Sequence, residues 1–145
     1  TGKQISGTEL NELRAAYAQA GITAWVQPYI DDMGAAYAAA DLGIGRCGAG
    51  TVAECWGAHL PSIFFPYPYH KDQHQLHNTK PLLAIDGAIA CTDHVEPETN
   101  MREHAQTLIE LLTGPDRLAK MRGALEALGQ PDGAVRIARA LVDRP

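Results

Sequence analysis

The sequence predicts an α/β fold: a doubly wound parallel sheet with helices on both faces and further helices at the C-terminal end. Three observations lead to this prediction. Short apolar segments alternate with stretches of helical periodicity, a glycine-rich turn joins one predicted strand to a helix, and the last third of the chain is helical in pattern. Such alternation is typical of parallel strands joined by helices, and 145 residues fit one domain.

The first predicted element is a helix that begins at a capping box. Ser6 and Glu9 have the S-x-x-E spacing in which side chains and backbone N–H groups bond reciprocally. Gly21 is suited to ending this helix. The apolar residues between them recur at helical spacing: Leu10, Leu13 and Tyr17. Residues 22–27 then predict a short strand.

The middle of the chain predicts three further strands with helices between them. Asp31 and Asp32 are expected to cap a helix. The predicted strands are residues 42–45, 61–65 and 88–91, a helix is expected over residues 51–58, and a loop with a helix over residues 70–83. Because four strands make a small doubly wound sheet, we expect one or two more strands upstream.

The C-terminal part predicts a series of helices separated by helix breakers. Gly114-Pro115 divides two of them, with Pro115 suited to a first turn, and residues 131–133 precede the last. Aromatic side chains elsewhere are assigned to core packing: Trp25, Tyr37, Trp56 and Phe64.

Composition excludes several classes of protein. The net charge of −5 and the pI of about 5.6 argue against a nucleic-acid binder, which needs a basic surface. No apolar run approaches the roughly 18 residues of a membrane span, and a signal peptide is not expected. Three cysteines without a C-x-x-C motif fit a reducing cytoplasm better than a disulfide framework or a zinc ribbon.

Ligands of open parallel sheets bind at the carboxyl ends of the strands. This rule predicts that a ligand site involves the turns at residues 28–33, 45–54 and 66–78. In the second turn, glycines let the backbone approach a ligand. The following helix start presents free N–H groups to a diphosphate, and Thr51 adds a hydroxyl. The alternative is an ordinary glycine-rich turn of an α/β protein.

The same turn also contains the spacing G-x-G-x-x-G, from Gly43 to Gly48. A dinucleotide site needs this motif after the first strand, with an acidic residue about 20 positions further on. Here the glycines span an internal strand, and that downstream stretch holds Phe64, Phe65 and prolines. An NAD site is therefore excluded.

Two polar groups near these turns have both a functional and a structural interpretation. Glu54 can accept hydrogen bonds from the two hydroxyls of a ribose, or it can simply stabilise the helix start. His70, His74 and His77 can form a polar edge for a sugar, a solvated helix surface, or a zinc site. No distant acid or cysteine is evident as a further zinc ligand.

Three linked motifs resemble the C-terminal domain of the MurG family. They are residues 29–37 (YIDDMGAAY), residues 46–54 (RCGAGTVAE) and residues 66–75 (PYPYHKDQHQ) followed by Asn78. Their order and spacing match across nearly the whole chain. The resemblance implies the C-terminal half of a GT-B fold, in which two Rossmann-like domains face each other across a cleft.

The resemblance also implies site residues. Ile30 would meet a uracil through its backbone, Glu54 would hold the ribose, and His74 and Gln75 would contact N-acetylglucosamine. The turn that lines the diphosphate and the adjoining sugar would comprise Arg46, Gly48, Ala49, Gly50 and Thr51. The family usually has serine where Cys47 stands, and many members have glutamine at the His74 position.

The function implied is the transfer of N-acetylglucosamine from UDP-N-acetylglucosamine to lipid I, giving lipid II in peptidoglycan synthesis at the cytoplasmic face of the inner membrane. This family inverts the anomeric carbon without a bound metal or cofactor. Residues 1–145 would be the nucleotide-sugar-binding domain, shortened at its N-terminal side. An absent N-terminal domain would supply the lipid I surface and the catalytic base, so the fragment alone is expected to be inactive.

Three alternatives remain open from the sequence. One is a related GT-B domain, such as that of a UDP-N-acetylglucosamine 2-epimerase. Another is the stand-alone subunit of a split dolichol-linked transferase. The third is a metal-binding module built on His70, His74 and His77.

Overall fold

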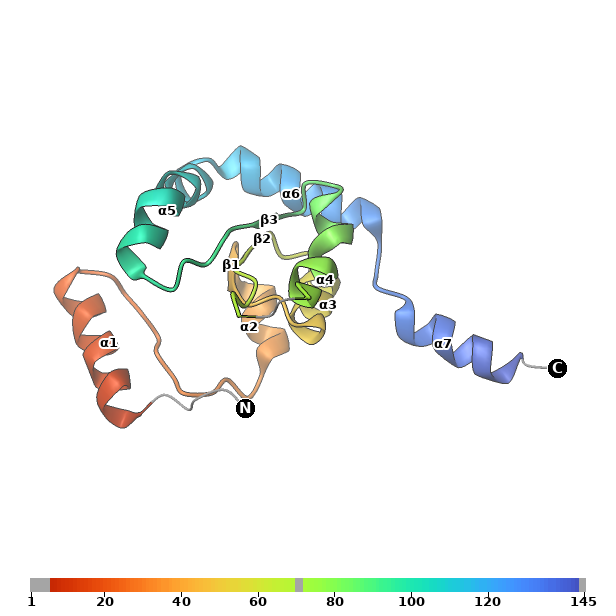
Figure 1. The fold of residues 1–145 in the computed structure, drawn as a ribbon, viewed down its shortest axis with the longest axis horizontal. Helices are drawn as coiled ribbons and strands as arrows, with labels where there is room; N and C mark the ends of the chain where they lie inside the picture. The colour runs from red at the N-terminus through yellow and green to blue at the C-terminus, as the bar shows by residue number, and fades with distance from the viewer. Residues whose placement is uncertain (1–5, 70–71, 144–145) are drawn as a thin grey trace. The chain divides into compact units, whose positions relative to one another are not determined.

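The computed structural model describes residues 6–69 and 72–143, which group into two compact units. The first unit extends to Ala36 and the second begins at Tyr37, within helix α2 (Met33–Ala39). Figure 1 labels the elements of both. The predicted site lies mainly in the second unit.

Helix α1 (Gly7–Gln19) confirms the predicted capping box. Glu9 N donates to Ser6 Oγ over 3.2 Å, and Ser6 N donates to Glu9 Oε2 over 2.8 Å. Gly21 follows the helix with a φ of 68°, a left-handed conformation that glycine adopts readily. Both ends of α1 therefore follow from local sequence.

The predicted strand at residues 22–27 is wrong. This segment has no strand assignment, and its Val26 carbonyl accepts two hydrogen bonds from the Arg14 side chain, at 2.7 and 3.1 Å. A strand needs a neighbouring strand for its backbone groups, and none among the described residues pairs with this segment. The core assignment of Trp25 is also wrong, since its side chain is 69% exposed.

Helix α2 begins as the sequence predicts. The Asp32 carboxylate accepts a hydrogen bond from Ala35 N over 2.8 Å, which satisfies one of the backbone N–H groups left unpaired at a helix start. Asp32 therefore caps the beginning of α2.

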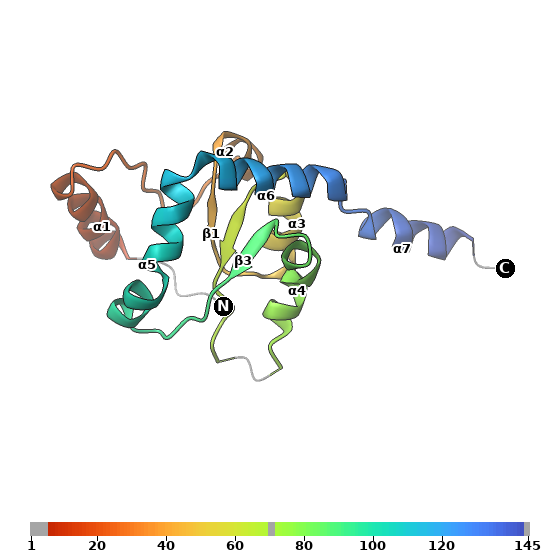
Figure 2. The ribbon, with the colours of Figure 1, turned by 90° about the horizontal axis from the view of Figure 1, so that it is seen from above.

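Three parallel strands form the sheet, in the order β1-β2-β3: β1 (Gly43–Gly45), β2 (Ser62–Phe64) and β3 (Ala88–Ala90). Ile44 lies opposite Ile63, which lies opposite Ile89. Each strand falls inside its predicted range. Figure 2 shows the strands running side by side.

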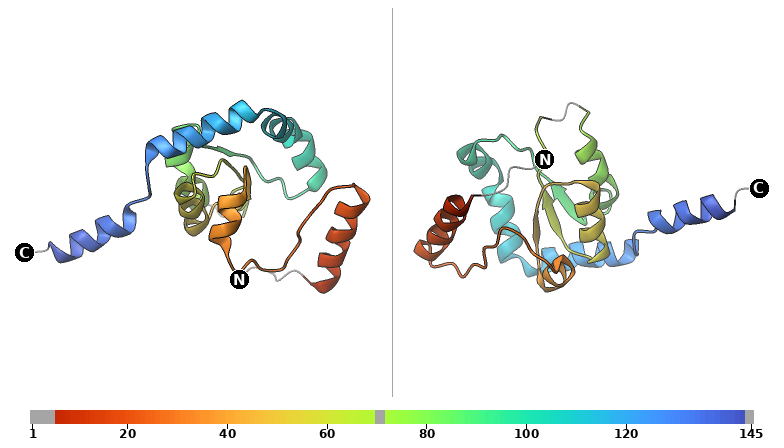
Figure 3. Two further views of the ribbon diagram at one scale, coloured as in Figure 1. Left: turned by 180° about the vertical axis from the view of Figure 1, so that it is seen from behind. Right: turned by 90° about the horizontal axis from the view of Figure 1, so that it is seen from below.

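Helices cover both faces of this sheet, as predicted. Helices α3 (Ala49–Gly57) and α4 (His74–Leu83) lie on one face, and α5 (Pro97–Thr113) and α6 (Pro115–Leu128) on the other (Figures 2 and 3). Because successive strand residues point to opposite faces, Phe64 and Ile63 belong to different cores. The first core includes Cys47, Val52, Cys55, Leu60, Phe64, Leu82, Ala88 and Leu125. The second comprises Ile63, Cys91, Leu111 and Met121.

The remaining aromatic assignments hold to different degrees. Phe64 is fully buried, whereas Tyr37 and Trp56 are partly buried against the first core. Trp56 Nε1 donates to the carbonyl of Gly129, beyond the end of α6. These three side chains pack as predicted.

Helix α7 (Gly133–Val142) ends the described chain, and all of its residues are exposed. No helix in the described part of the chain is both long and apolar enough to cross a membrane.

Candidate functional site

The carboxyl ends of the three strands lie together at one edge of the sheet. Backbone pairing continues just beyond them: Phe65 N donates to Gly45 O over 2.9 Å, and Cys91 N donates to Phe64 O over 2.8 Å. The three loops that leave these strands therefore begin side by side. Parallel α/β sheets place their ligand sites at this edge.

The glycine-rich turn after β1 leads directly into α3, which begins at Ala49, two residues earlier than predicted. Gly48 is the N-cap and supplies no side-chain hydrogen bond. The N–H groups of the first turn, together with the positive end of the helix dipole, therefore point outward from the helix start. A Cβ at Gly45, Gly48 or Gly50 would meet no atom within 4 Å. The turn thus leaves open space for a ligand.

Cys47 fixes this turn to the protein interior. Its side chain is fully buried in the first core, and its carbonyl accepts a hydrogen bond from Asn78 Nδ2 on α4, over 3.1 Å. Burial raises the pKa of the thiol. The Cys47 side chain therefore packs in the core, while Asn78 holds the turn against α4.

Glu54 lies on the exposed side of α3, where Tyr37 from α2 orients it. Tyr37 Oη donates to Glu54 Oε2 over 3.2 Å. Burial, with smaller contributions from Cys55 and Glu54, raises the pKa of Tyr37 to about 12. A phenol that keeps its proton is a permanent donor, so this hydrogen bond fixes one carboxylate oxygen of Glu54.

Arg46 links the ends of all three strands. Its Nη1 donates to the carbonyls of Phe65 and Pro66, at 3.1 and 3.2 Å, and its Nη2 lies 2.6 Å from Asp93 Oδ2. The guanidinium also lies over the Tyr67 ring, 5.6 Å from its centre. Arg46 therefore holds the loop edge together through contacts within the protein.

Asp93 follows β3 and is the most constrained carboxylate at this edge, with a side chain only 8% exposed. Its Oδ1 accepts hydrogen bonds from Asn100 Nδ2 (2.9 Å) and Val95 N (2.8 Å). These bonds, Asn100 first, together with Arg46 lower the pKa of Asp93 to about 2, against the opposing effect of burial. Asp93 is therefore ionised throughout the physiological range.

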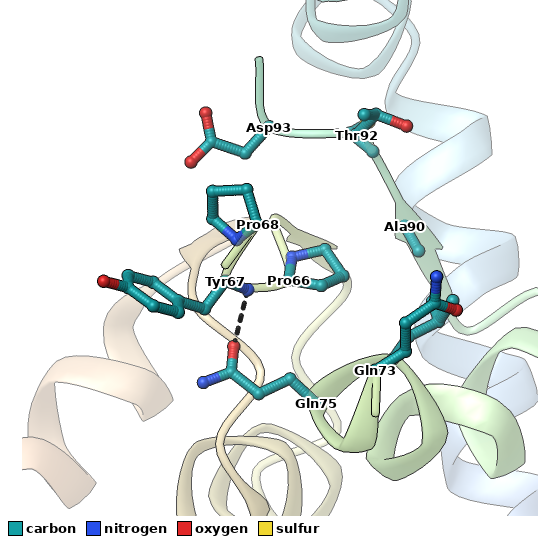
Figure 4. A pocket seen from close by; sticks show the side chains of 10 residues that line it. Pro66, Tyr67, Pro68, Gln73, Gln75, Ala90, Thr92 and Asp93 are labelled. Carbon is teal, nitrogen blue, oxygen red and sulfur yellow. Dashed lines mark hydrogen bonds between the residues drawn. The ribbon is translucent and has the colours of Figure 1, made fainter. Parts of the chain in front are cut away.

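A pocket of about 480 Å³ opens between the loop after β2 and the end of β3. Figure 4 shows Tyr67, Gln73, Gln75, Thr92 and Asp93 around it, with the prolines of the β2–α4 loop. Tyr67 N donates to Gln75 Oε1 over 2.9 Å, which directs the Gln75 side chain along the pocket wall. The volume is within the range of small-molecule sites, roughly 300–1,000 Å³.

His74 begins α4 at the exposed side of this region. Its Nδ1 lies 2.9 Å from Asp72 Oδ1, which sets the orientation of the ring. His70 lies outside the described residues, and His77 is exposed on α4. In the part of the chain that the structure describes, neither His74 nor His77 belongs to a group of three possible metal ligands.

The structure brings most of the predicted site residues to one edge. Seven of them lie on the loops and helix starts of the second unit: Arg46, Gly48, Ala49, Gly50, Thr51, His74 and Gln75. Glu54 lies further along α3 in the same unit. Ile30 belongs to the first unit, in the segment that follows α1 in sequence, and is half-buried. Sequence reasoning missed Asp93 and Thr92, although the strand-end rule also applies to the end of β3.

Fold and site together define an α/β domain with the layout of nucleotide-binding domains: a parallel sheet covered on both faces, with a glycine turn and a helix start at its carboxyl edge. The family follows from sequence comparison. Residues 2–137 match the model of the glycosyltransferase family 28 C-terminal domain. The chain belongs to this family.

Similar proteins agree with this assignment. The UDP-N-acetylglucosamine–N-acetylmuramyl-(pentapeptide) pyrophosphoryl-undecaprenol N-acetylglucosamine transferase of Alkalilimnicola ehrlichii is 38% identical over 140 residues, covering 97% of this chain and 38% of that protein. The protein of the same name from Maricaulis maris is 40% identical over 139 residues, 96% of this chain and 37% of that protein.

A solved structure gives the same result. The crystal structure of Acinetobacter baumannii MurG matches with a TM-score of 0.79 and 30% sequence identity, over 97% of this chain and 40% of that chain. The predicted fold class, the Rossmann-like C-terminal half of a GT-B transferase, is confirmed. The chain spans less than two fifths of the length of the two curated relatives named above.

Proposed function

We propose that this chain is the UDP-N-acetylglucosamine-binding half of an inverting transferase that converts lipid I to lipid II in peptidoglycan synthesis. The observation that carries the proposal is the α3 start, with an open glycine turn and an oriented Glu54 on one helix. The relatives are named as N-acetylglucosamine transferases, which favours this reading over an epimerase, a dolichol-linked subunit or a metal-binding module.

The diphosphate is expected at the N-terminal end of α3. The glycines leave room for phosphate oxygens to approach the backbone. First-turn N–H groups and the helix dipole favour negative charge, and Thr51 adds a hydroxyl donor. The same groups would stabilise the charge that develops on the leaving UDP.

The ribose is expected at Glu54. A carboxylate can accept hydrogen bonds from both hydroxyls of a ribose, and the bond from Tyr37 Oη leaves Glu54 Oε1 and further lone pairs for this role. Because Tyr37 restricts the side chain, less rotamer entropy is lost on binding. The backbone of Ile30 is the proposed partner of the uracil.

The N-acetylglucosamine is expected at the start of α4, beside the pocket of Figure 4. Gln75 accepts from Tyr67 N through Oε1, so its amide NH₂ is the group proposed to donate to sugar hydroxyls. His74, oriented by Asp72, is proposed as a second sugar contact. Arg46 was predicted to bind the donor; its contacts favour a role in holding the loops instead.

The acceptor side belongs to a second domain in this proposal. A base from that domain would deprotonate the lipid I hydroxyl, which would attack the anomeric carbon as UDP leaves. Half of a two-domain cleft cannot position the acceptor or exclude water. We therefore expect the chain alone to bind the donor without transferring it, and the complete enzyme to work at the cytoplasmic face of the inner membrane.

Calorimetric titration of the chain with UDP and UDP-N-acetylglucosamine tests donor binding, with Glu54→Ala as the variant. Losing charged hydrogen bonds to the ribose is expected to weaken binding by about 10- to 100-fold. Glu126→Ala, which removes an exposed glutamate from α6, is the matched control and should bind like the wild type. Equal affinities of wild type and Glu54→Ala would contradict the ribose assignment.

A further inference from the structure

We propose that His94, Glu103 and His104 form a binding site for a divalent transition-metal ion of the zinc type. The three residues lie outside the proposed donor site, and the inference does not depend on that function. In the described part of the chain they are the one group of three possible ligands close enough to share an ion, with ligand atoms all within 4.8 Å of one another.

The three side chains come from two adjoining segments. His94 lies in the connection after β3, and Glu103 and His104 lie in the second turn of α5. His94 Nε2 is 2.6 Å from Glu103 Oε2, and His104 Nε2 is 3.9 Å from Glu103 Oε1. The two imidazole rings are nearly parallel, with centres 6.2 Å apart. The Glu103 carboxylate therefore contacts both histidines.

The loop that carries His94 is held in place by other hydrogen bonds. His94 N donates to Asn100 Oδ1 over 2.9 Å, and Asn100 Nδ2 donates to Asp93 over 2.9 Å. Phe65 packs edge-on against the His104 ring, at 5.4 Å between centres. Such supporting contacts orient ligand side chains and raise affinity for a metal.

The donor set suits zinc. Two neutral imidazoles and one carboxylate match the composition of known zinc sites. His104 Nε2 lies 2.7 Å from the carbonyl oxygen of Thr92, so binding through Nε2 requires that hydrogen bond to break and the ring proton to move to Nδ1. Zinc–ligand distances of about 2.0–2.2 Å also require His94 and Glu103 to separate slightly, with the ion replacing their shared proton.

The site would fasten the β3–α5 connection to α5. His94 comes from the connection and the other two ligands from the helix, so one ion would cross-link them. Asp93, which binds Arg46, is the residue before His94. The proposed ion would therefore stabilise the connection that follows β3, at the carboxyl ends of the strands.

Titration of the chelator-treated chain with zinc chloride tests the proposal, followed by cobalt chloride as a spectroscopic probe. The wild type should bind one ion, gain thermal stability on adding zinc, and give the strong visible absorption of low-coordinate cobalt. His94→Ala should weaken zinc binding at least about 10-fold. Glu103→Gln, which preserves side-chain shape, should do the same while circular dichroism shows an unchanged fold.

His77→Ala is the matched control because His77 is an exposed histidine on a different helix. Its zinc affinity should equal that of the wild type. Three results would overturn the proposal: no saturable zinc binding by the wild type, equal affinity in wild type and His94→Ala, or a loss in His77→Ala as large as in His94→Ala. The last result would place the ion among the histidines of the β2–α4 region.

Discussion

Arg46 Nη2 and Asp93 Oδ2 lie 2.6 Å apart, and this ion pair joins the end of β1 to the end of β3 across β2. Arg46 also donates to two carbonyls after β2, so one guanidinium contacts the loops of all three strands. These loops carry the proposed phosphate and sugar contacts. Their relative positions therefore depend in part on a pair that need not touch the donor.

Replacing Asp93 with alanine should lower the free energy of unfolding by about 1–3 kcal/mol, because two hydrogen bonds to a nearly buried carboxylate are lost. Arg46 is about half exposed, so water can replace its lost partner. The interaction energy between Arg46 and Asp93 should therefore be smaller, roughly 0.5–1 kcal/mol. Urea unfolding of Arg46→Ala, Asp93→Ala and the double variant measures both. If the loss of unfolding free energy in the double variant equals the sum of the two single losses within about 0.3 kcal/mol, the two residues are not coupled.

Asp93 should also contribute to acid stability. Its pKa is about 2 in the folded chain, below its ordinary value of 3.8, so folding favours the ionised form. The stabilisation is fully present above about pH 4 and is lost as the pH falls toward 2. Urea unfolding of wild type and Asp93→Asn at several pH values should give a stability difference that shrinks over this window; a difference independent of pH would contradict the low pKa.

Tyr37 should ionise only at strongly alkaline pH. Its pKa is raised from 10.0 to about 12, so its contribution to stability is present below pH 10 and is lost as the pH rises toward 12. Ultraviolet titration of tyrosinate should show a late step that disappears in Tyr37→Phe. Tyr17→Phe, which removes a more exposed tyrosine from α1, is the control and should retain that step.

Two glycines should respond to alanine in opposite directions. A Cβ at Gly114, between α5 and α6, would lie 2.6 Å from the backbone oxygen of Glu110, so Gly114→Ala should destabilise the chain by about 1–3 kcal/mol. A Cβ at Gly123, inside α6, meets nothing within 4 Å, so Gly123→Ala should stabilise it by about 0.4–1 kcal/mol. Thermal unfolding of both variants measures the signs, and an unchanged stability in Gly114→Ala would contradict the packing there.

Helix starts and buried strands could be predicted from sequence because their signals are local. The Ser6–Glu9 capping box and the Asp32 cap depend on residues three apart. Strand β2 lies in a short segment rich in apolar residues, and all three of its residues are buried. Local sequence could not show that residues 22–27 do not form a strand, because a strand depends on a hydrogen-bonding partner elsewhere in the chain. Trp25 was assigned to the core on the same mistaken basis.

The glycine-rich turn of the candidate site could be predicted from sequence because it depends on local backbone geometry. Glycines followed by a helix start indicated the turn at residues 45–51. The links between elements were not predictable: Tyr37 was assigned to packing, although it also reaches Glu54, 17 residues further on. The Arg46–Asp93 pair spans 47 positions of sequence, and no local pattern identifies such partners.

Chemical-shift mapping tests the central claim most directly, namely that the start of α3 holds a nucleoside diphosphate. Backbone amide resonances of the isotope-labelled chain would be followed while UDP is added, with uridine as the phosphate-free control. The account predicts that UDP shifts the amides of Gly48 to Thr51 and of Glu54, and that uridine leaves the Gly48–Thr51 amides unchanged. Saturable UDP binding that leaves these amides unmoved would contradict it.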